Sequence, residues 1–160
     1  MNILDINSIF DDVEKSPKIY LFDSQFLPDV TISDYLKRIV QYSNCSTEVI
    51  IQSLIHISRI SRDKSQISVN SISIHRLLLT AILCTAKFFD DVYFNNISFS
   101  KMGGIPLNEL NSLEIEFLAL INFEFLIDYD NYIGFYNTMF RNDLHNFCNC
   151  HVGLVPRYNN

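Results

Sequence analysis

The sequence contains no tryptophan, and glycine and proline occur only four times each among its 160 residues. So few helix-breaking residues favour long helices over many short strands. No stretch approaches the roughly 18 consecutive apolar residues of a membrane-spanning helix, so none is predicted. Basic residues are also scarce: 12 Lys and Arg face 18 Asp and Glu, without any basic cluster. The net charge of −6 therefore disfavours nucleic acid and anionic membranes as partners.

Signals for targeting, metal binding and catalysis are equally scarce. The first residues, MNILDINSIFDD, lack the basic segment of a signal peptide, and neither end carries a lipidation motif. We therefore expect an intracellular protein, cytoplasmic and/or nuclear. The adjacent Gly103 and Gly104 lack the Lys and Ser or Thr that complete a phosphate-binding loop. CNCH at 148–151 has no second cluster of ligands, and His56 and His75 fall on predicted helices as structural residues. No metal, cofactor, small-molecule ligand or enzymatic activity is expected.

The hydrophobic pattern predicts an all-α protein. Hydrophobic residues make up 48% of the chain and charged residues 19%, as in folded globular proteins. Apolar residues recur at helical spacing over most of the chain. Five core helices are expected, at 32–44, 47–63, 71–90, 95–102 and 106–123. Short flanking helices are expected at 5–14 and 129–142. This organisation predicts an N-terminal arm at 1–30, a single domain at 31–142 and a C-terminal tail at 143–160.

Capping residues mark the ends of these helices. Ser33 is the candidate N-cap of the first helix, and Ser46 or Thr47 of the second. Pro106 is expected at the first position of the fifth helix, where a missing N–H is tolerated. The glycine pair before it suits a left-handed helix stop.

A single lysine interrupts the most apolar helix, 71–90. Apolar residues fall on all sides of this segment, which is typical of a central helix. Lys87 stands near its end, next to aromatic residues, with Asp90 and Asp91 at i+3 and i+4. Such an intrahelical pair contributes only about 0.2–0.5 kcal/mol, and Lys before Asp is the poorer order. A carboxylate on another helix is therefore the better candidate partner.

Glu114 is the candidate for that carboxylate. On its own helix it shares a stripe with Leu107, Leu118 and Phe125. A carboxylate among apolar side chains is costly unless a cation neutralises it. An ammonium has three donors and a carboxylate about four acceptor positions. A pair formed with Lys87 could therefore still hydrogen-bond an incoming backbone.

Several motifs in order carry a family resemblance. They are ISDYLKRIVQYSNCS at 32–46, HRLLLTAILCTAKFFDD at 75–91, YFNN at 93–96, KMGG at 101–104 and ELNSLEIEFLALINFEF at 109–125. From about residue 31 to 127 the chain resembles the cyclin box of P/U-type cyclins, which are related to the yeast phosphate-regulon cyclin.

The resemblance implies a five-helix cyclin box that binds and activates a cyclin-dependent kinase. In such complexes the third and fifth cyclin helices grip the kinase αC helix. Lys87 and Glu114 match the family's charged pair, which would bind kinase backbone groups beside that helix. Hydrophobic contacts to the kinase would fall on Cys84, Phe88, Leu118, Phe123 and Phe125.

The sequence also departs from the family pattern. The first helix lacks the Arg-containing hydrophobic motif of many cyclins, so a substrate-docking cleft is not expected. Ser58 stands where an acid is common, and Pro106 where a Ser cap is common. Two alternatives remain: a cyclin-fold interaction module without a kinase partner, and an enzyme with an all-helical fold. The presence of both Lys87 and Glu114 favours the kinase-activating function.

Overall fold

A computed structural model describes residues 21–62, 67 and 69–147, and every regular element in these segments is a helix. The helices are α1 (Ile32–Ser43), α2 (Thr47–Arg62), α3 (Ile74–Phe89), α4 (Asn96–Gly103), α5 (Leu107–Leu120) and α6 (Tyr129–Phe147). The predicted all-α class is confirmed, as are five core helices followed by a flanking C-terminal helix. α6 ends at Phe147 rather than near residue 142. The helix predicted at 5–14 lies outside the described residues.

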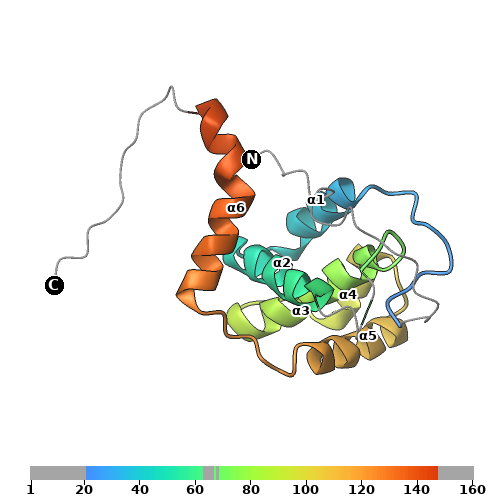
Figure 1. Cartoon of the computed structure of the whole chain (residues 1–160). Coiled ribbons are helices and arrows are strands. Elements are labelled where there is room, and N and C mark those ends of the chain that lie inside the picture. Colours follow the sequence, from blue (N-terminus) through green and yellow to red (C-terminus); the bar gives the residue numbers. More distant parts are fainter. Residues whose placement is uncertain (1–20, 63–66, 68, 148–160) are drawn as a thin grey trace.

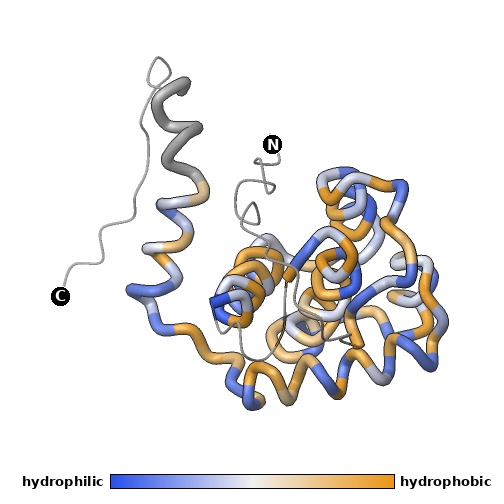
Figure 2. Tube along the Cα trace, turned by 45° about the vertical axis from the view of Figure 1, so that its right-hand side comes forward, coloured by the Kyte–Doolittle hydropathy of each residue, from blue (hydrophilic) through white to orange (hydrophobic). Residues whose placement is uncertain are grey.

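α3 is the central helix, as its apolar character predicts. It packs against α1, α2, α4 and α5, which surround it (Figure 1). Every residue from Leu77 to Ala86 is buried. The neighbouring helices bury a smaller share of their residues, and hydrophobic and hydrophilic residues follow one another along them (Figure 2). α3 therefore forms the axis of the fold, and its two ends are where its polar residues can reach the surface.

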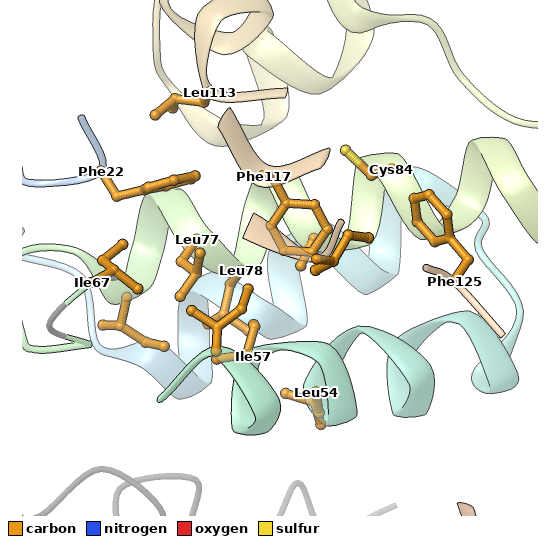
Figure 3. Packing of buried hydrophobic residues seen from close by; sticks show 14 residues of the cluster. Phe22, Leu54, Ile57, Ile67, Leu77, Leu78, Cys84, Leu113, Phe117 and Phe125 are labelled. Atoms are coloured by element: carbon orange, nitrogen blue, oxygen red, sulfur yellow. The ribbon is translucent and has the colours of Figure 1, made fainter. Parts of the chain in front are cut away.

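Two hydrophobic clusters flank α3. The first joins α2, α3 and α5, and Figure 3 shows Phe117 lying among side chains of these helices. The second joins α1, α3 and α4 through residues such as Leu36, Leu79 and Phe99. Phe22, which precedes α1, is 1% exposed and belongs to the first cluster. The segment before α1 therefore contributes to the core.

The first two helices begin at hydroxyl caps. The Oγ1 of Thr31 accepts a hydrogen bond from the backbone N–H of Asp34 at 3.1 Å, so Thr31 is the N-cap of α1. The prediction of Ser33 is wrong, because the helix starts two residues earlier than that cap requires. At the start of α2, Ser46 Oγ accepts from the N–H of Val49 at 3.3 Å. Of the two alternatives for α2, Ser46 makes the capping hydrogen bond.

The turn between α4 and α5 sets the position of α5. Gly104 has a φ of 70°, so the predicted left-handed stop of α4 is confirmed. Pro106 is the N-cap of α5 rather than its first helical residue, with extended backbone angles. Gly103 is buried against Leu79 of α3, which brings the end of α4 close to the central helix.

Beyond α5 the chain turns and continues as α6, which contacts α2 at the side of the bundle (Figure 1). Asp128 caps α6 by accepting a hydrogen bond from the backbone N–H of Asn131 at 2.9 Å. That bond lowers the pKa of the exposed Asp128 carboxyl below its usual value. Within the described segments, none of the helices has the length and hydropathy needed to cross a membrane.

Candidate functional site

Lys87 and Glu114 form an ion pair between two helices. Lys87 lies in the last turn of α3, where the helix dipole favours a cation, and Glu114 lies in the middle of α5. Lys87 Nζ is 2.5 Å from Glu114 Oε1. The two side chains are 29% and 18% exposed, so the pair lies at the surface without being freely solvated. The predicted interhelical pair is confirmed.

The aspartates after Lys87 do not compete for it in the described part of the chain. Asp90 caps the end of α3, and its Oδ2 accepts a hydrogen bond from the backbone N–H of Ser46 at 3.3 Å. It thereby ties the end of α3 to the start of α2. Lys87 Nζ donates only to Glu114 among the described residues. Since an ammonium carries three N–H groups, two of them remain available.

The second oxygen of Glu114 is bound by a residue that the sequence did not single out. Asn96, the first residue of α4, donates from Nδ2 to Glu114 Oε2 at 2.6 Å. The same Nδ2 group lies 2.8 Å from Asn111 Oδ1 on α5. Both carboxylate oxygens are therefore held, one by a cation and one by a neutral donor. No local signal marks Asn96 for this role, because its partner lies 18 residues away on another helix.

Aromatic residues follow both members of the ion pair along the chain. Phe88 is 52% exposed and stacks on Phe125, with ring centroids 4.6 Å apart and planes 12° from parallel. Phe89 meets the Phe88 ring edge-on at 4.8 Å. Phe123 is 69% exposed and has a φ of 57°, in the left-handed region that bulky residues rarely adopt. Its N–H bonds to the Leu118 carbonyl at 2.9 Å, which closes the end of α5.

The structure divides the predicted site residues into two layers. Lys87, Glu114, Phe88, Leu118 and Phe123 are exposed or partly exposed. Cys84 and Phe125 are buried at 3% and 7% exposure, and both belong to the first core cluster (Figure 3). These two residues therefore support the surface from below.

The chemistry of Cys84 fits a supporting role. Burial and the nearby Glu114 carboxylate raise the pKa of its thiol, so the side chain stays neutral. A neutral buried thiol behaves as a small hydrophobic group.

The connection from α3 to α4 adds exposed apolar residues that the sequence analysis did not assign. They are Val92, Tyr93 and Phe94, followed by Ile97 in the first turn of α4. Their exposed fractions run from 44% to 81%. Ile115, next to Glu114 on α5, is 69% exposed. Exposed apolar residues this frequent in the segments that carry the charged pair are typical of an interaction surface.

A second ion pair also joins α3 to α5. Arg76 Nε, near the start of α3, is 2.5 Å from Glu109 Oε1 in the first turn of α5. The sequence did not single out this pair, although Arg76 is followed by three leucines in the chain. The two helices that carry the candidate site are therefore fixed to each other by two interhelical ion pairs and a shared core.

The helix-borne histidines are part of the core, as predicted. His56 is fully buried and packs edge-on against Phe117 and Phe125, at centroid distances of 6.5 and 5.7 Å. Burial lowers the pKa of His56 to about 4. His75 Nε2 lies 2.8 Å from the Val30 carbonyl oxygen, which ties α3 to the segment before α1.

Within the described segments, no three His, Cys, Asp or Glu side chains are grouped to hold a metal ion. The CNCH segment at 148–151 lies outside those residues.

Comparison with known proteins places these features in a family. Residues 5–125 match the model of the Cyclin family. Cyclin-U4-1 of Arabidopsis thaliana is 33% identical over 125 residues, which cover 78% of this chain and 62% of that protein. Cyclin-P4-1 of Oryza sativa is 37% identical over 111 residues, covering 69% and 52%. The PHO85 cyclin-like protein psl1 of Schizosaccharomyces pombe is 35% identical over 112 residues, covering 69% and 46%.

The matches thus span between about half and three fifths of the length of these relatives. The family model, matched over residues 5–125, includes Lys87, Glu114 and the aromatic residues Phe88, Phe89, Phe123 and Phe125. The helical architecture agrees with it, since α3 lies at the centre of four surrounding helices. The chain belongs to the cyclin family, and its helical domain is a cyclin box of the P/U type.

Proposed function

We propose that this cyclin box is a regulatory subunit that binds and activates a cyclin-dependent kinase, and that α3 and α5 grip the αC helix of the kinase. The observation that carries the proposal is the Lys87–Glu114 pair. It lies at the surface next to Phe88 in the sequence, and two of the Lys87 ammonium donors have no partner among the described residues. Similarity to cyclins, one of them named a PHO85 cyclin-like protein, supports a kinase of this class as the partner.

The energetics of the pair favour a role in binding over a role in folding. Partly burying two charges costs desolvation free energy, and apolar residues of similar size often stabilise a fold as well or better. An ion pair at 18–29% exposure therefore adds little to the stability of the free chain. A partner that supplies carbonyl oxygens to the unused donors of Lys87 gains charge-assisted hydrogen bonds. The pair would then fix the register of the complex.

Phe88 and Phe123 would supply most of the affinity. Phe88 stacks on the buried Phe125 ring, so little side-chain freedom is lost when a partner covers it. Phe123 is held outward by a left-handed backbone conformation that costs about 1–3 kcal/mol. Exposed aromatic residues on a fixed backbone are typical energetic centres of protein interfaces.

Activation follows from a preference for one kinase conformation. A kinase is active when its αC helix is turned inward and the β3 Lys–αC Glu ion pair forms. A surface that fits only the inward helix shifts the population toward the active state. Moving that equilibrium from 1:99 to 99:1 needs about 5.5 kcal/mol of differential binding. About three contacts of about 2 kcal/mol each would supply this amount.

We assign this function to the domain at residues 31–142, with the arm at 1–30 contributing Phe22 to its core. The function would place the protein inside the cell, with its kinase, in the cytoplasm or nucleus. A regulatory subunit of this kind needs no catalytic residues of its own.

The proposal is tested with the cyclin-dependent kinases encoded in the genome from which the chain derives. Each purified kinase is assayed on a generic protein substrate with and without the chain. We expect one or a few kinases to bind and gain activity, and Lys87→Ala or Glu114→Ala to impair this while circular dichroism stays unchanged. Failure to bind any of these kinases would favour an interaction module without a kinase partner. Turnover by the chain alone would favour an enzyme.

A further inference from the structure

We propose that Asn96 is a positioning residue for the charged pair: it holds Glu114 so that the free donors of Lys87 face the kinase. This inference rests on the proposed function and adds a third helix, α4, to the binding site. Asn96 Nδ2 reaches Glu114 Oε2 at 2.6 Å and Asn111 Oδ1 at 2.8 Å. Glu114 Oε1 then remains for Lys87.

The orientation of the Asn96 amide is determined by its neighbours. Its NH2 group carries two donors, while its carbonyl oxygen only accepts. Two acceptor oxygens, from Glu114 and Asn111, lie on the same side of the amide. Only the nitrogen can face both of them. Asn96 therefore acts as a double donor whose position is fixed from two points on α5.

Because the two Glu114 oxygens have different partners, the number of Lys87 donors left for the kinase depends on Asn96. With Oε2 occupied by Asn96, Glu114 presents a single oxygen to the ammonium. Without Asn96, the carboxylate is free to rotate and to engage Lys87 with both oxygens or to turn toward solvent. Either change moves or occupies donors that a partner backbone would use. Asn96 thus acts on binding through Glu114.

A neutral donor suits this position better than a second cation. The cluster of Lys87, Glu114 and Asn96 carries no net charge, so a partner covers it at a lower desolvation cost than an unbalanced group. An arginine or lysine at position 96 would compete with Lys87 for the same carboxylate. Asn96→Asp would place a carboxylate beside Glu114, which would repel it and attract the Lys87 ammonium away from the kinase-facing side.

The adjacent Asn95 has a different role and supplies a matched control. Asn95 is the N-cap of α4, and its Oδ1 accepts from the N–H of Ser98 at 3.0 Å. Its side chain is exposed, whereas that of Asn96 is half-buried. The two asparagines therefore separate the stability of α4 from the orientation of Glu114, although they are neighbours in the sequence.

The test measures binding of the purified kinase that the wild-type chain activates. We expect Asn96→Ala to weaken binding about tenfold, which corresponds to about 1.4 kcal/mol. Asn96→Asp should weaken binding more, because it adds a repulsive carboxylate beside Glu114. Asn95→Ala should lower the thermal midpoint of the free chain while changing binding less than Asn96→Ala. Wild-type affinity in both Asn96 variants would overturn the inference.

A double-mutant cycle separates positioning from a general structural effect. If Asn96 acts through Glu114, the double variant Asn96→Ala with Glu114→Ala binds the kinase as Glu114→Ala alone does. The same loss in both backgrounds would overturn the inference. The two proposals fail in different ways. If Lys87→Ala and Glu114→Ala both bind normally, the proposed function fails; if they weaken binding and the Asn96 variants do not, only the positioning role fails.

Discussion

Exchanging the two charges, Lys87→Glu with Glu114→Lys, tests whether the pair serves binding or folding. The exchange keeps opposite charges facing each other between α3 and α5. It moves the ammonium from α3 to α5, where Asn96 Nδ2 would face a cation in place of a carboxylate oxygen. Because opposite charges still face each other, the free chain should recover part of the stability that the single substitutions lose. Kinase binding should not recover, since the donors no longer project from the end of α3.

The expected magnitudes follow from partial exposure of the pair. Exposed ion pairs contribute about 0–1 kcal/mol, whereas breaking a buried pair costs about 3–5 kcal/mol. At 29% and 18% exposure, Lys87→Ala or Glu114→Ala should cost the free chain about 1–2 kcal/mol. A domain stable by about 5–15 kcal/mol stays folded. In the complex, truncating a covered hydrogen-bonded charge costs about 2–5 kcal/mol, or roughly 30-fold to several thousand-fold in Kd.

The four chains to compare are the wild type, Lys87→Ala, Glu114→Ala and the exchanged variant. Urea unfolding measures the stability of each chain, and calorimetric titration with the activated kinase measures its affinity. We expect the exchanged variant to be more stable than either alanine variant and to bind at least about 30-fold more weakly than wild type. Wild-type binding by the exchanged variant would refute the reasoning, because charge neutralisation alone would then suffice. Unfolding of either alanine variant would show that the pair is structural.

Three further predictions concern single residues. Phe88→Ala should weaken kinase binding about 30-fold or more, and Asp91→Ala less than about fivefold, because only Phe88 presents a large ring fixed by stacking. Gly103→Ala should destabilise the free chain by about 1–3 kcal/mol in urea unfolding, since its Cβ would lie 2.1 Å from the buried Leu79 Cδ2. The pKa of His56 is about 4 in the folded chain, below its usual value of about 6.5. The free energy of unfolding should therefore fall by up to about 3 kcal/mol as the pH falls from about 6.5 to 4.

Each of these has a control. Equal losses of kinase affinity in Phe88→Ala and Asp91→Ala would contradict the role of Phe88 as an aromatic anchor of the interface. Gly134→Ala, where no atom lies within 4 Å of the new Cβ, should be neutral or stabilising, in contrast to position 103. As the pH falls, His56 is protonated in the unfolded chain at a higher pH than in the folded chain. Its contribution to stability is therefore fully present above about pH 6.5 and is lost between about pH 6.5 and 4. A His56→Leu variant should show a shallower loss; an unchanged pH profile would contradict a neutral buried imidazole.

The sequence predicted the helices well because helix formation is read from local spacing. Helical periodicity located α1 to α5 to within a few residues, and the uniformly apolar α3 was predicted to be central before any contact was known. Cap residues were less predictable. Thr31 and Ser33 both carry hydroxyls near the start of α1, and only the backbone angles of Thr31 select it as the cap.

The ion pair was predictable for a different reason. Lys87 and Glu114 each stand among apolar neighbours along their own helix, and each charge therefore needs a partner from elsewhere. Arg76 and Glu109 form a pair of the same 2.5 Å length but were not predicted. Arg76 precedes Leu77, Leu78 and Leu79, so an apolar setting along the chain did not by itself identify every such pair.

The sequence alone determined that this chain is helical, which helix is central, and that two charges in apolar settings should meet. These properties depend on the spacing of residues within one helix, and such spacing is visible in a linear string. Only the tertiary structure decided that Asn96 from α4 binds the second oxygen of Glu114, that Phe125 lies beneath Phe88, and that Cys84 is covered. Those outcomes depend on how three helices are placed against one another, because contacts between distant segments arise from the packing of the whole core.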